Sequence, residues 1–252
     1  MTEDFEKYQR GDIMKRLGLI MSISVLFTLF CLLPFTACAY EETPVVGGGA
    51  IKGKVIYNGA VPMRKVIPTK DQEVCGGIRE DPQVLIGPNN GVLDAIVYLK
   101  DVPKGRKWDK SKAELANHQC QFNPHVQVIP VGKDVTIVNS DPVLHNTHGF
   151  LIRTTVFNVA MPKQGMRVAR PLRKPGIIRV ECDAHGWMLA WIYVADNPYY
   201  VMTGKDGTFT IPDVLPGNYT LVVWQEYAGS KEIPVTVKAR ETVALHTIEL
   251  KK

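Results

Sequence analysis

The feature that most constrains the fold is a recurrence of short β-type runs along the chain after residue 40. Runs rich in Val, Ile, Thr and Tyr return about every ten residues, with Gly, Pro, Asn and Asp between them. The clearest runs cover residues 51–57, 95–99, 126–131, 134–138, 177–181, 191–194, 219–224 and 235–237. Regularly spaced strands and turns predict an all-β chain of sandwiches or barrels. A single short helix is expected over residues 111–118, where Ala113, Glu114 and Leu115 favour helix.

The first 39 residues predict an export signal rather than a part of the fold. Met14-Lys15-Arg16 precedes an almost wholly apolar run over residues 17–33, and small residues follow. Two processing outcomes stay open. An A-x-A pattern over residues 37–39 suits cleavage before Tyr40, whereas F-T-A-C over residues 35–38 resembles a bacterial lipobox that would leave Cys38 lipidated. An uncleaved anchor is less favoured, because Pro34 and small residues follow the apolar run. The mature chain is expected in the periplasm or at the cell surface.

The cysteines predict one disulfide and one thiol with another task. Export places the mature chain in an oxidising compartment. Of five cysteines, Cys31 is lost with the signal, Cys38 is lost or lipidated, and Cys75, Cys120 and Cys182 remain. Since the remaining number is odd and Cys182 lies in a ligand-rich stretch, Cys75–Cys120 is the pair we expect.

The stretch E-C-D-A-H-G-W-M over residues 181–188 collects soft metal ligands. Cys182, His185 and Met188 stand three residues apart, and an upstream strand ending in N-S-D delivers His145. One thiolate, two imidazoles and one thioether are the ligands of a blue-copper site. The alternative is that these side chains only pack in a β core, as a lone Cys or Met usually does.

Residues 122–194 resemble a cupredoxin, a Greek-key blue-copper domain, and the three-ligand loop is most like that of amicyanin. The resemblance implies one type 1 copper, with His145 and His185 as equatorial nitrogens, Cys182 as thiolate and Met188 as weak axial ligand. It also implies that Asn146 forms a hydrogen bond tying the two ligand loops together. Trp187 and Phe150 are expected to keep the site apolar.

Two further histidines leave alternatives open. His148 lies three residues after His145 and is an alternative or extra ligand, but this odd offset places the two on opposite faces of a strand. We therefore favour His145. His125 is expected to be a surface or structural residue, with a second metal site beside Cys120 as the alternative.

The C-terminal part resembles the carboxypeptidase-regulatory, transthyretin-like β-sandwich. The resemblance rests on a D-G-x-F hairpin at residues 206–209 and a P-G-x-Y turn at residues 216–219. Matching upstream pieces are residues 53–59 and 95–99. We therefore expect one discontinuous sandwich from residues 48–104 and 198–252, with the cupredoxin domain, residues 105–197, inserted between its strands.

The function expected from these patterns is transfer of single electrons between redox partners outside the cytoplasm. A c-type cytochrome or a dehydrogenase would be such a partner. The net charge of +5 is too small to indicate nucleic-acid binding, and membrane contact is expected only through a lipid anchor. A basic run over residues 163–179 is either a solvated face or a surface that steers an acidic partner.

No catalysis is expected, because G-x-S-x-G, paired-carboxylate and Gly-rich phosphate-loop patterns are absent. Three alternatives stay open: copper delivery without electron transfer, an oxidoreductase with an open copper position, and a structural adhesion module.

Overall fold

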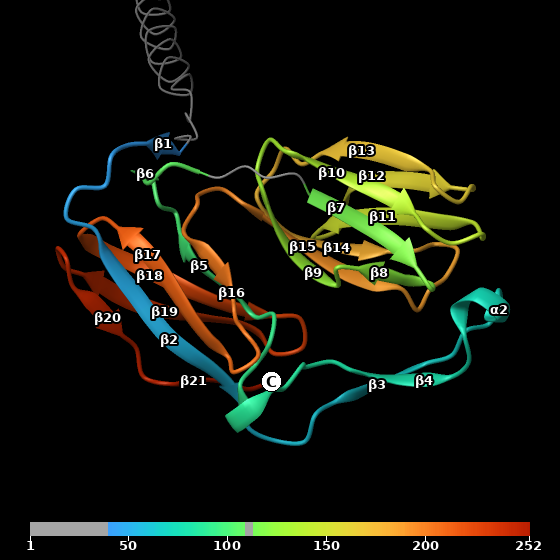
Figure 1. Cartoon of the computed structure of the whole chain (residues 1–252), viewed down its shortest axis with the longest axis horizontal. Helices are drawn as coiled ribbons and strands as arrows, with labels where there is room; N and C mark the ends of the chain where they lie inside the picture. The colour runs from blue at the N-terminus through green and yellow to red at the C-terminus, as the bar shows by residue number, and fades with distance from the viewer. Residues whose placement is uncertain (1–39, 109–112) are drawn as a thin grey trace, which may run out of the picture. The chain divides into compact units, whose positions relative to one another are not determined.

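The computed structural model describes residues 40–108 and 113–252 (Figure 1). The predicted export signal, with Cys38, lies outside the described residues. Residues from 39 onward cluster as one compact unit. In the part of the chain that is described, no helix has the length and apolar character needed to cross a membrane.

The predicted all-β class is confirmed, and each run quoted above overlaps a strand. A first sandwich, defined by strands β2, β5 and β16–β21, combines segments from both ends of the described chain (Figure 1). One sheet has the order β16-β5-β18-β19, and the other has the order β17-β2-β20 with β21 also paired to β2. The bounds are β2 Gly49–Tyr57, β5 Ile96–Lys100, β16 Tyr200–Met202, β17 Thr208–Val214, β18 Gly217–Gln225, β19 Gly229–Val237, β20 Thr242–Ala244 and β21 Ile248–Leu250. Its assignment to the transthyretin-like family, and the domain boundaries drawn from it, stay predictions.

A second sandwich, strands β7–β15, carries the candidate ligands. A four-stranded sheet β13-β10-β7-β8 faces a five-stranded sheet β12-β11-β14-β15-β9. The bounds are β7 Ala113–His118, β8 Gln121–Asn123, β9 Val126–Pro130, β10 Asp134–Asn139, β11 His145–Leu151, β12 Thr154–Met161, β13 Arg167–Pro171, β14 Gly176–Glu181 and β15 Leu189–Ala195. Alternate residues of both sheets, such as Leu115, Ile137 and Ile192, are fully buried in one core between them.

The expectation of a helix over residues 111–118 is wrong where the structure describes it, because residues 113–118 form strand β7. This strand pairs in parallel with β10 and antiparallel with β8. Leu115 and Asn117 are fully buried and their neighbours are more exposed, which is the alternation of a strand. Pairing on both edges therefore overrides the helix propensity of Ala, Glu and Leu.

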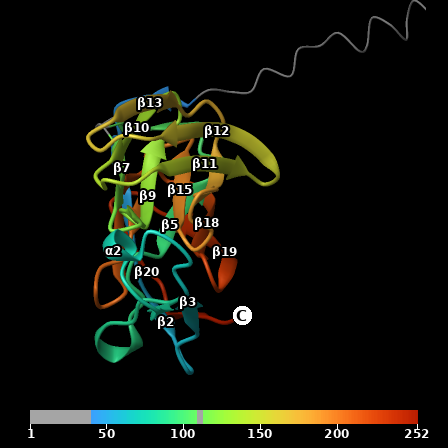
Figure 2. The same cartoon turned by 90° about the vertical axis from the view of Figure 1, so that its right-hand side faces the viewer.

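A long excursion between β2 and β5 reaches the second sandwich. We define the arm as residues 63–82. It contains β3 Met63–Val66, the short helix α2 Gln72–Cys75 and β4 Arg79–Pro82, and β3 pairs with β4 (Figures 1 and 2). Cys75 of α2 is buried in the core of the second sandwich. Three short pieces complete the described chain: β1 Glu41–Glu42, which pairs with β6 Lys104–Gly105, and the 3-10 turn η1 Pro88–Asn90.

The two sandwiches also share a small apolar cluster. Ile96 of β5 and Trp224 of β18 pack there with Tyr193 and Ala195 of β15. The rings of Tyr98 and Tyr193 pack in a tilted arrangement with centroids 4.4 Å apart, and Trp191 meets Trp224 edge to face at 5.4 Å.

Candidate metal centre

Three of the four predicted ligands converge in the core of the second sandwich. His145 begins β11, and Cys182 and His185 lie in the loop between β14 and β15. His145 Nδ1 is 3.1 Å from His185 Nδ1, and Cys182 Sγ is 3.9 Å from the first and 3.7 Å from the second. Both imidazoles are fully buried, and Cys182 is 1 % exposed. The loop is compact, because the N–H of His185 donates to the Cys182 carbonyl and the N–H of Met188 to that of His185.

The outer nitrogens of both imidazoles contact carboxylates. His145 Nε2 is 2.8 Å from Asp141 Oδ2, and His185 Nε2 is 2.9 Å from Asp71 Oδ2. When each Nε2 carries the proton that it donates, each Nδ1 presents a lone pair. Burial lowers the pKa of His145 despite the hydrogen bond to Asp141, which favours the neutral ring. In this tautomer two buried lone pairs face each other beside a thiol, an arrangement that a shared cation stabilises.

The spacing of the three atoms fits one ion. Ligands at about 2.0 Å for nitrogen and about 2.3 Å for sulfur, about 120° apart around one ion, lie about 3.5 Å (N to N) and about 3.7 Å (N to S) from one another. The observed 3.1, 3.7 and 3.9 Å are close to these separations.

Asn146 links the strand that carries His145 to the loop that carries Cys182. Its backbone N–H donates to Cys182 Sγ at 3.3 Å, and its side-chain oxygen accepts from the N–H of Asp183 at 3.2 Å. This is the bridging arrangement that the resemblance implied for this residue.

Of the remaining residues predicted for the site, Met188 and Trp187 lie near the ligands, whereas Phe150 does not. Met188 is 3 % exposed and belongs to the same apolar core as Cys182, and the Trp187 ring lies 5.0 Å from the His185 ring. The expectation for Phe150 is wrong, because its ring packs on His148 at 3.9 Å. Phe150 lies five residues after His145 on β11, and an odd offset turns its side chain to the other face.

His148 lies on that other face too and is not brought to the centre. Its Nδ1 is 3.2 Å from both carboxylate oxygens of Asp183, and its Nε2 is 3.0 Å from the hydroxyl of Thr155. The alternation of β11 separates it from His145.

His125 joins the two sandwiches. One ring nitrogen contacts the Leu189 carbonyl at 2.9 Å and the other the Glu226 carboxylate at 2.7 Å, so both are engaged. Burial lowers its pKa, but the hydrogen bond and charge of Glu226 outweigh this effect, and the net pKa is raised.

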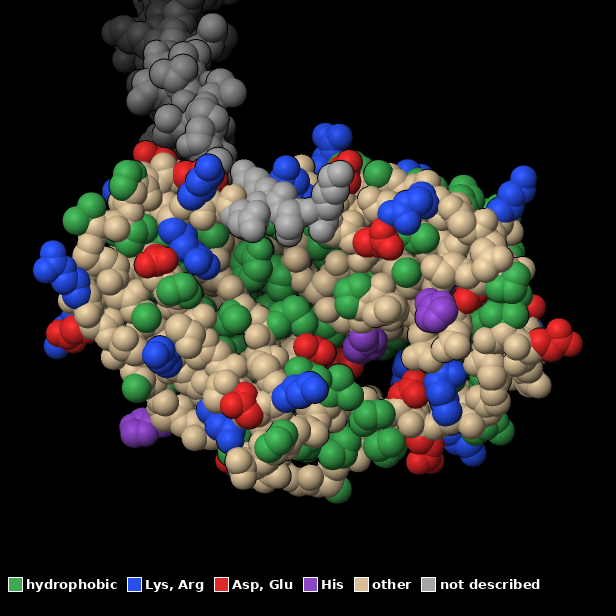
Figure 3. Space-filling model, in the orientation of Figure 1, with side chains coloured by type: hydrophobic (Ala, Val, Ile, Leu, Met, Phe, Trp, Pro, Cys, Tyr) green, Lys and Arg blue, Asp and Glu red, His purple; other side chains and the backbone are tan. Residues whose placement is uncertain are grey.

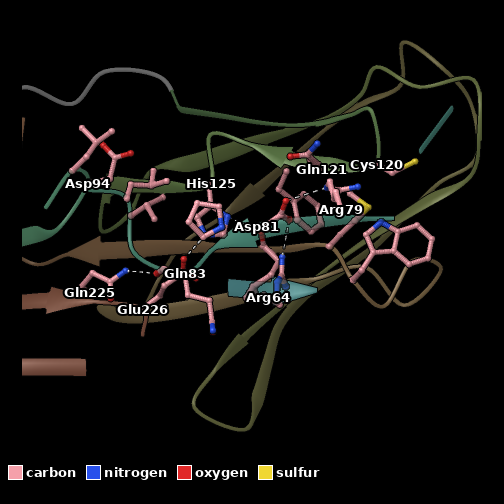
Figure 4. Close-up of a pocket in the computed structure, with 18 of the residues that line it drawn as sticks. Arg64, Arg79, Asp81, Gln83, Asp94, Cys120, Gln121, His125, Gln225 and Glu226 are labelled. Carbon is pink, nitrogen blue, oxygen red and sulfur yellow. Dashed lines mark hydrogen bonds and ion pairs between the residues drawn. The ribbon is translucent and has the colours of Figure 1, made fainter. Parts of the chain in front are cut away.

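His125 and Glu226 line a cavity of about 260 Å³ beneath the arm, where Arg64 and Arg79 lie on either side of Asp81 (Figure 4).

Cys75 and Cys120 form a disulfide, the pair expected from the cysteine count.

The structure adds two residues for which no role was predicted from the sequence, Asp71 and Asp141. Asp141 is 3 % exposed and also accepts from the N–H groups of Gln119 and Cys120. Asp141 stands four residues before His145, so the sequence alone could have indicated it. No local pattern indicates Asp71, because it lies 114 residues before His185.

The basic run is partly neutralised by neighbouring acids. Arg167 pairs with Glu114, and Arg179 lies 2.9 Å from Glu181. The face drawn in Figure 3 shows basic and acidic side chains interspersed. The complete run is Lys163, Arg167, Arg170, Arg173, Lys174 and Arg179.

Similar solved structures are cupredoxins and a copper enzyme, each matched over about a third of the chain. A copper-containing nitrite reductase from Thermus scotoductus is 23% identical, with a TM-score of 0.30, over 36% of this chain and 24% of its own. A purple cupredoxin from Nitrosopumilus maritimus is 24% identical, with a TM-score of 0.30, over 33% of this chain and 100% of its own. Amicyanin from Paracoccus versutus is 15% identical, with a TM-score of 0.31, over 39% and 97%.

A different likeness covers the C-terminal part. Residues 176–245 match the family model described as polysaccharide lyase family 4, domain II. A probable rhamnogalacturonate lyase A from Aspergillus flavus is 42% identical over 53 residues, which are 21% of this chain. The chain spans only 10% of the length of that curated relative.

These two matches contradict the expectation that the chain has no enzymatic character. That expectation rested on the absence of short catalytic patterns. Such an absence does not exclude an enzyme, because catalytic groups are brought together by the fold and need not form a local pattern.

Proposed function

We propose that the chain holds one copper ion through His145, Cys182, His185 and Met188 and transfers single electrons. The observation that carries the proposal is the pair of buried Nδ1 atoms 3.1 Å apart beside the Cys182 thiol, each with its outer nitrogen at a carboxylate. Soft sulfur with imidazole nitrogen favours copper in both of its common oxidation states.

The surroundings of the ligands support rapid electron exchange. Copper supplies a one-electron couple, and the protein's part is to keep the ligands in one arrangement in both states. Asp141 and Asp71 orient the two imidazoles, and Asn146 fixes the sulfur relative to β11. Complete burial of both rings excludes water, so little reorganisation accompanies the change in charge.

The visible spectrum of the copper-loaded chain tests this proposal. We expect an intense thiolate-to-copper charge-transfer band that disappears in Cys182→Ser and persists in Cys75→Ser/Cys120→Ser. A fast and reversible redox couple would distinguish electron transfer from copper delivery. A wild-type chain that binds copper without such a band would contradict the proposal.

The cellular setting is also a proposal. An exported chain, soluble or attached through a lipidated Cys38, would meet partners such as a c-type cytochrome or a dehydrogenase in the periplasm or at the cell surface. The exposed basic residues Lys163, Arg173 and Lys174 support an acidic partner. A redox reaction that slows with rising ionic strength and with charge-reversed variants of these residues would test this.

A second candidate function concerns carbohydrate. The match of residues 176–245 to a polysaccharide lyase domain favours it, and this segment contains Trp187 and Trp224, which line the cavity beneath the arm. Calorimetric titration with rhamnogalacturonan fragments tests it, and Trp224→Ala should weaken any binding at this cavity.

A further inference from the structure

The arm contributes a carboxylate to the metal centre from outside the second sandwich. Asp71 Oδ2 lies 2.9 Å from His185 Nε2, although 114 residues separate the two in the sequence. The side chain of His185 is fully buried, whereas that of Asp71 is 37% exposed. The carboxylate therefore stands between the imidazole and the solvent.

A disulfide one helical turn away fixes the position of Asp71. The N–H groups of Val74 and Cys75 donate to the Asp71 carbonyl at 3.0 and 2.8 Å, so Asp71 and Cys75 belong to the same turn. Cys75 is bonded to Cys120, and both are buried. Both sulfurs lie within 4.8 Å of a ring nitrogen of His185. Movement of the Asp71 backbone away from the ring would therefore require the turn to leave its covalent anchor.

We propose that Asp71 is a positioning residue of the metal centre and that the Cys75–Cys120 disulfide holds it in place. The inference rests on the proposed function and specifies a residue that tunes that site. The Asp71 carboxylate accepts the Nε2 proton of His185 and so leaves a lone pair on Nδ1, the nitrogen that faces Cys182 and His145. Without this acceptor the proton can occupy Nδ1, where His145 Nδ1 would accept it at 3.1 Å. One ligand atom of the centre would then be blocked.

The first test needs no metal. In the full apo chain labelled with ¹⁵N-histidine, ring-nitrogen correlation spectra should show His185 protonated at Nε2 in the wild type. Asp71→Ala should move the proton toward Nδ1, and Asp71→Asn, which keeps an acceptor oxygen, should retain the wild-type tautomer. Glu73→Ala is the matched control, because Glu73 is an exposed acid in the same helix. Cys75→Ser/Cys120→Ser should speed solvent exchange of the Nε2 proton by at least about 10-fold.

The second test uses copper. The apparent Kd for Cu(II) should rise about 10- to 100-fold in Asp71→Ala and stay unchanged in Glu73→Ala. An unchanged His185 tautomer and an unchanged Kd in Asp71→Ala would overturn the inference while leaving the proposed function intact. A wild-type chain without the charge-transfer band, but with a tautomer that still depends on Asp71, would overturn the proposed function and leave the positioning role standing.

Discussion

At the scale of single residues, the burial of Cys182 determines the protonation state of the thiol that a metal ion would bind. Burial raises the pKa of this thiol above its ordinary value of 9.0, although the N–H groups of Asn146, His185 and Ala184 act in the opposite direction. The apo chain therefore holds Cys182 as the neutral thiol at pH 7, and a metal ion must displace that proton to bind the thiolate.

Copper uptake should therefore release about one proton from Cys182 at pH 7. The apparent affinity should fall about tenfold for each unit by which the pH decreases, because the thiolate form becomes rarer. Titration of Cu(II) into weakly buffered protein with a pH indicator measures the release, and Cys182→Ser should release one proton fewer. Equal release from both proteins would show that Cys182 is not a ligand.

At the scale of elements, the alternation of β11 separates two histidines that the sequence places close together. His145 faces the core of the second sandwich, whereas His148 faces Asp183 and Thr155. Because successive side chains of a strand point to opposite faces, the offset of three residues was enough to predict this separation.

His145→Ala should weaken Cu(II) binding by more than about 100-fold, because it removes a ligand rather than an outer contact, and the charge-transfer band should appear only at correspondingly higher copper concentrations. His148→Ala should keep both the band and the affinity of the wild type. The pair is matched in residue type and strand, and a visible-spectrum titration measures both. Loss of the band in His148→Ala alone would reverse the assignment.

Strand β7 gives a second test at this scale. Leu115→Ala should lower the free energy of unfolding by about 2–5 kcal/mol, because a fully buried side chain leaves a cavity. Glu114→Ala, one residue away, removes a half-exposed partner of Arg167 and should cost less than about 1 kcal/mol. Urea unfolding of the disulfide-intact chain measures both. Equal effects would contradict the strand alternation of residues 113–118.

At the scale of the whole molecule, Glu226 at the end of the first sandwich ties it to the second. Its carboxylate contacts His125 Nε2 at 2.7 Å and accepts from Trp191 Nε1 at 2.5 Å. Since the folded state raises the pKa of His125, the stabilisation from this pair is complete below the ordinary histidine value of 6.5. It is lost as the pH rises through the raised pKa.

Glu226→Gln should therefore destabilise the chain by up to about 1 kcal/mol near pH 6, and the difference from wild type should shrink toward pH 9. Glu232→Gln removes an exposed acid paired with Lys100, with no histidine involved, and should show no such change. Unfolding in urea at several pH values measures the difference. A difference for Glu226→Gln that grows with pH would contradict the assignment.

The parts of the structure that could be predicted are those with a local signal. Two-residue alternation and turn residues predict the strands, and the spacing of residues 182–188 predicts a ligand loop. Asp71 could not be found this way, because its role depends on an arm that crosses from one sandwich to the other. The helix expected over residues 111–118 was wrong for a related reason where the structure describes it, since β7 exists through its pairing with β10 and β8.

The most direct test of the metal centre is X-ray absorption at the copper edge of the loaded full chain. We expect two imidazole nitrogens at about 2.0 Å and one thiolate sulfur at about 2.2–2.3 Å, and Cys182→Ser should remove the scatterer at this short distance. A first shell of oxygen and nitrogen alone in the wild type would contradict the site at His145, Cys182 and His185.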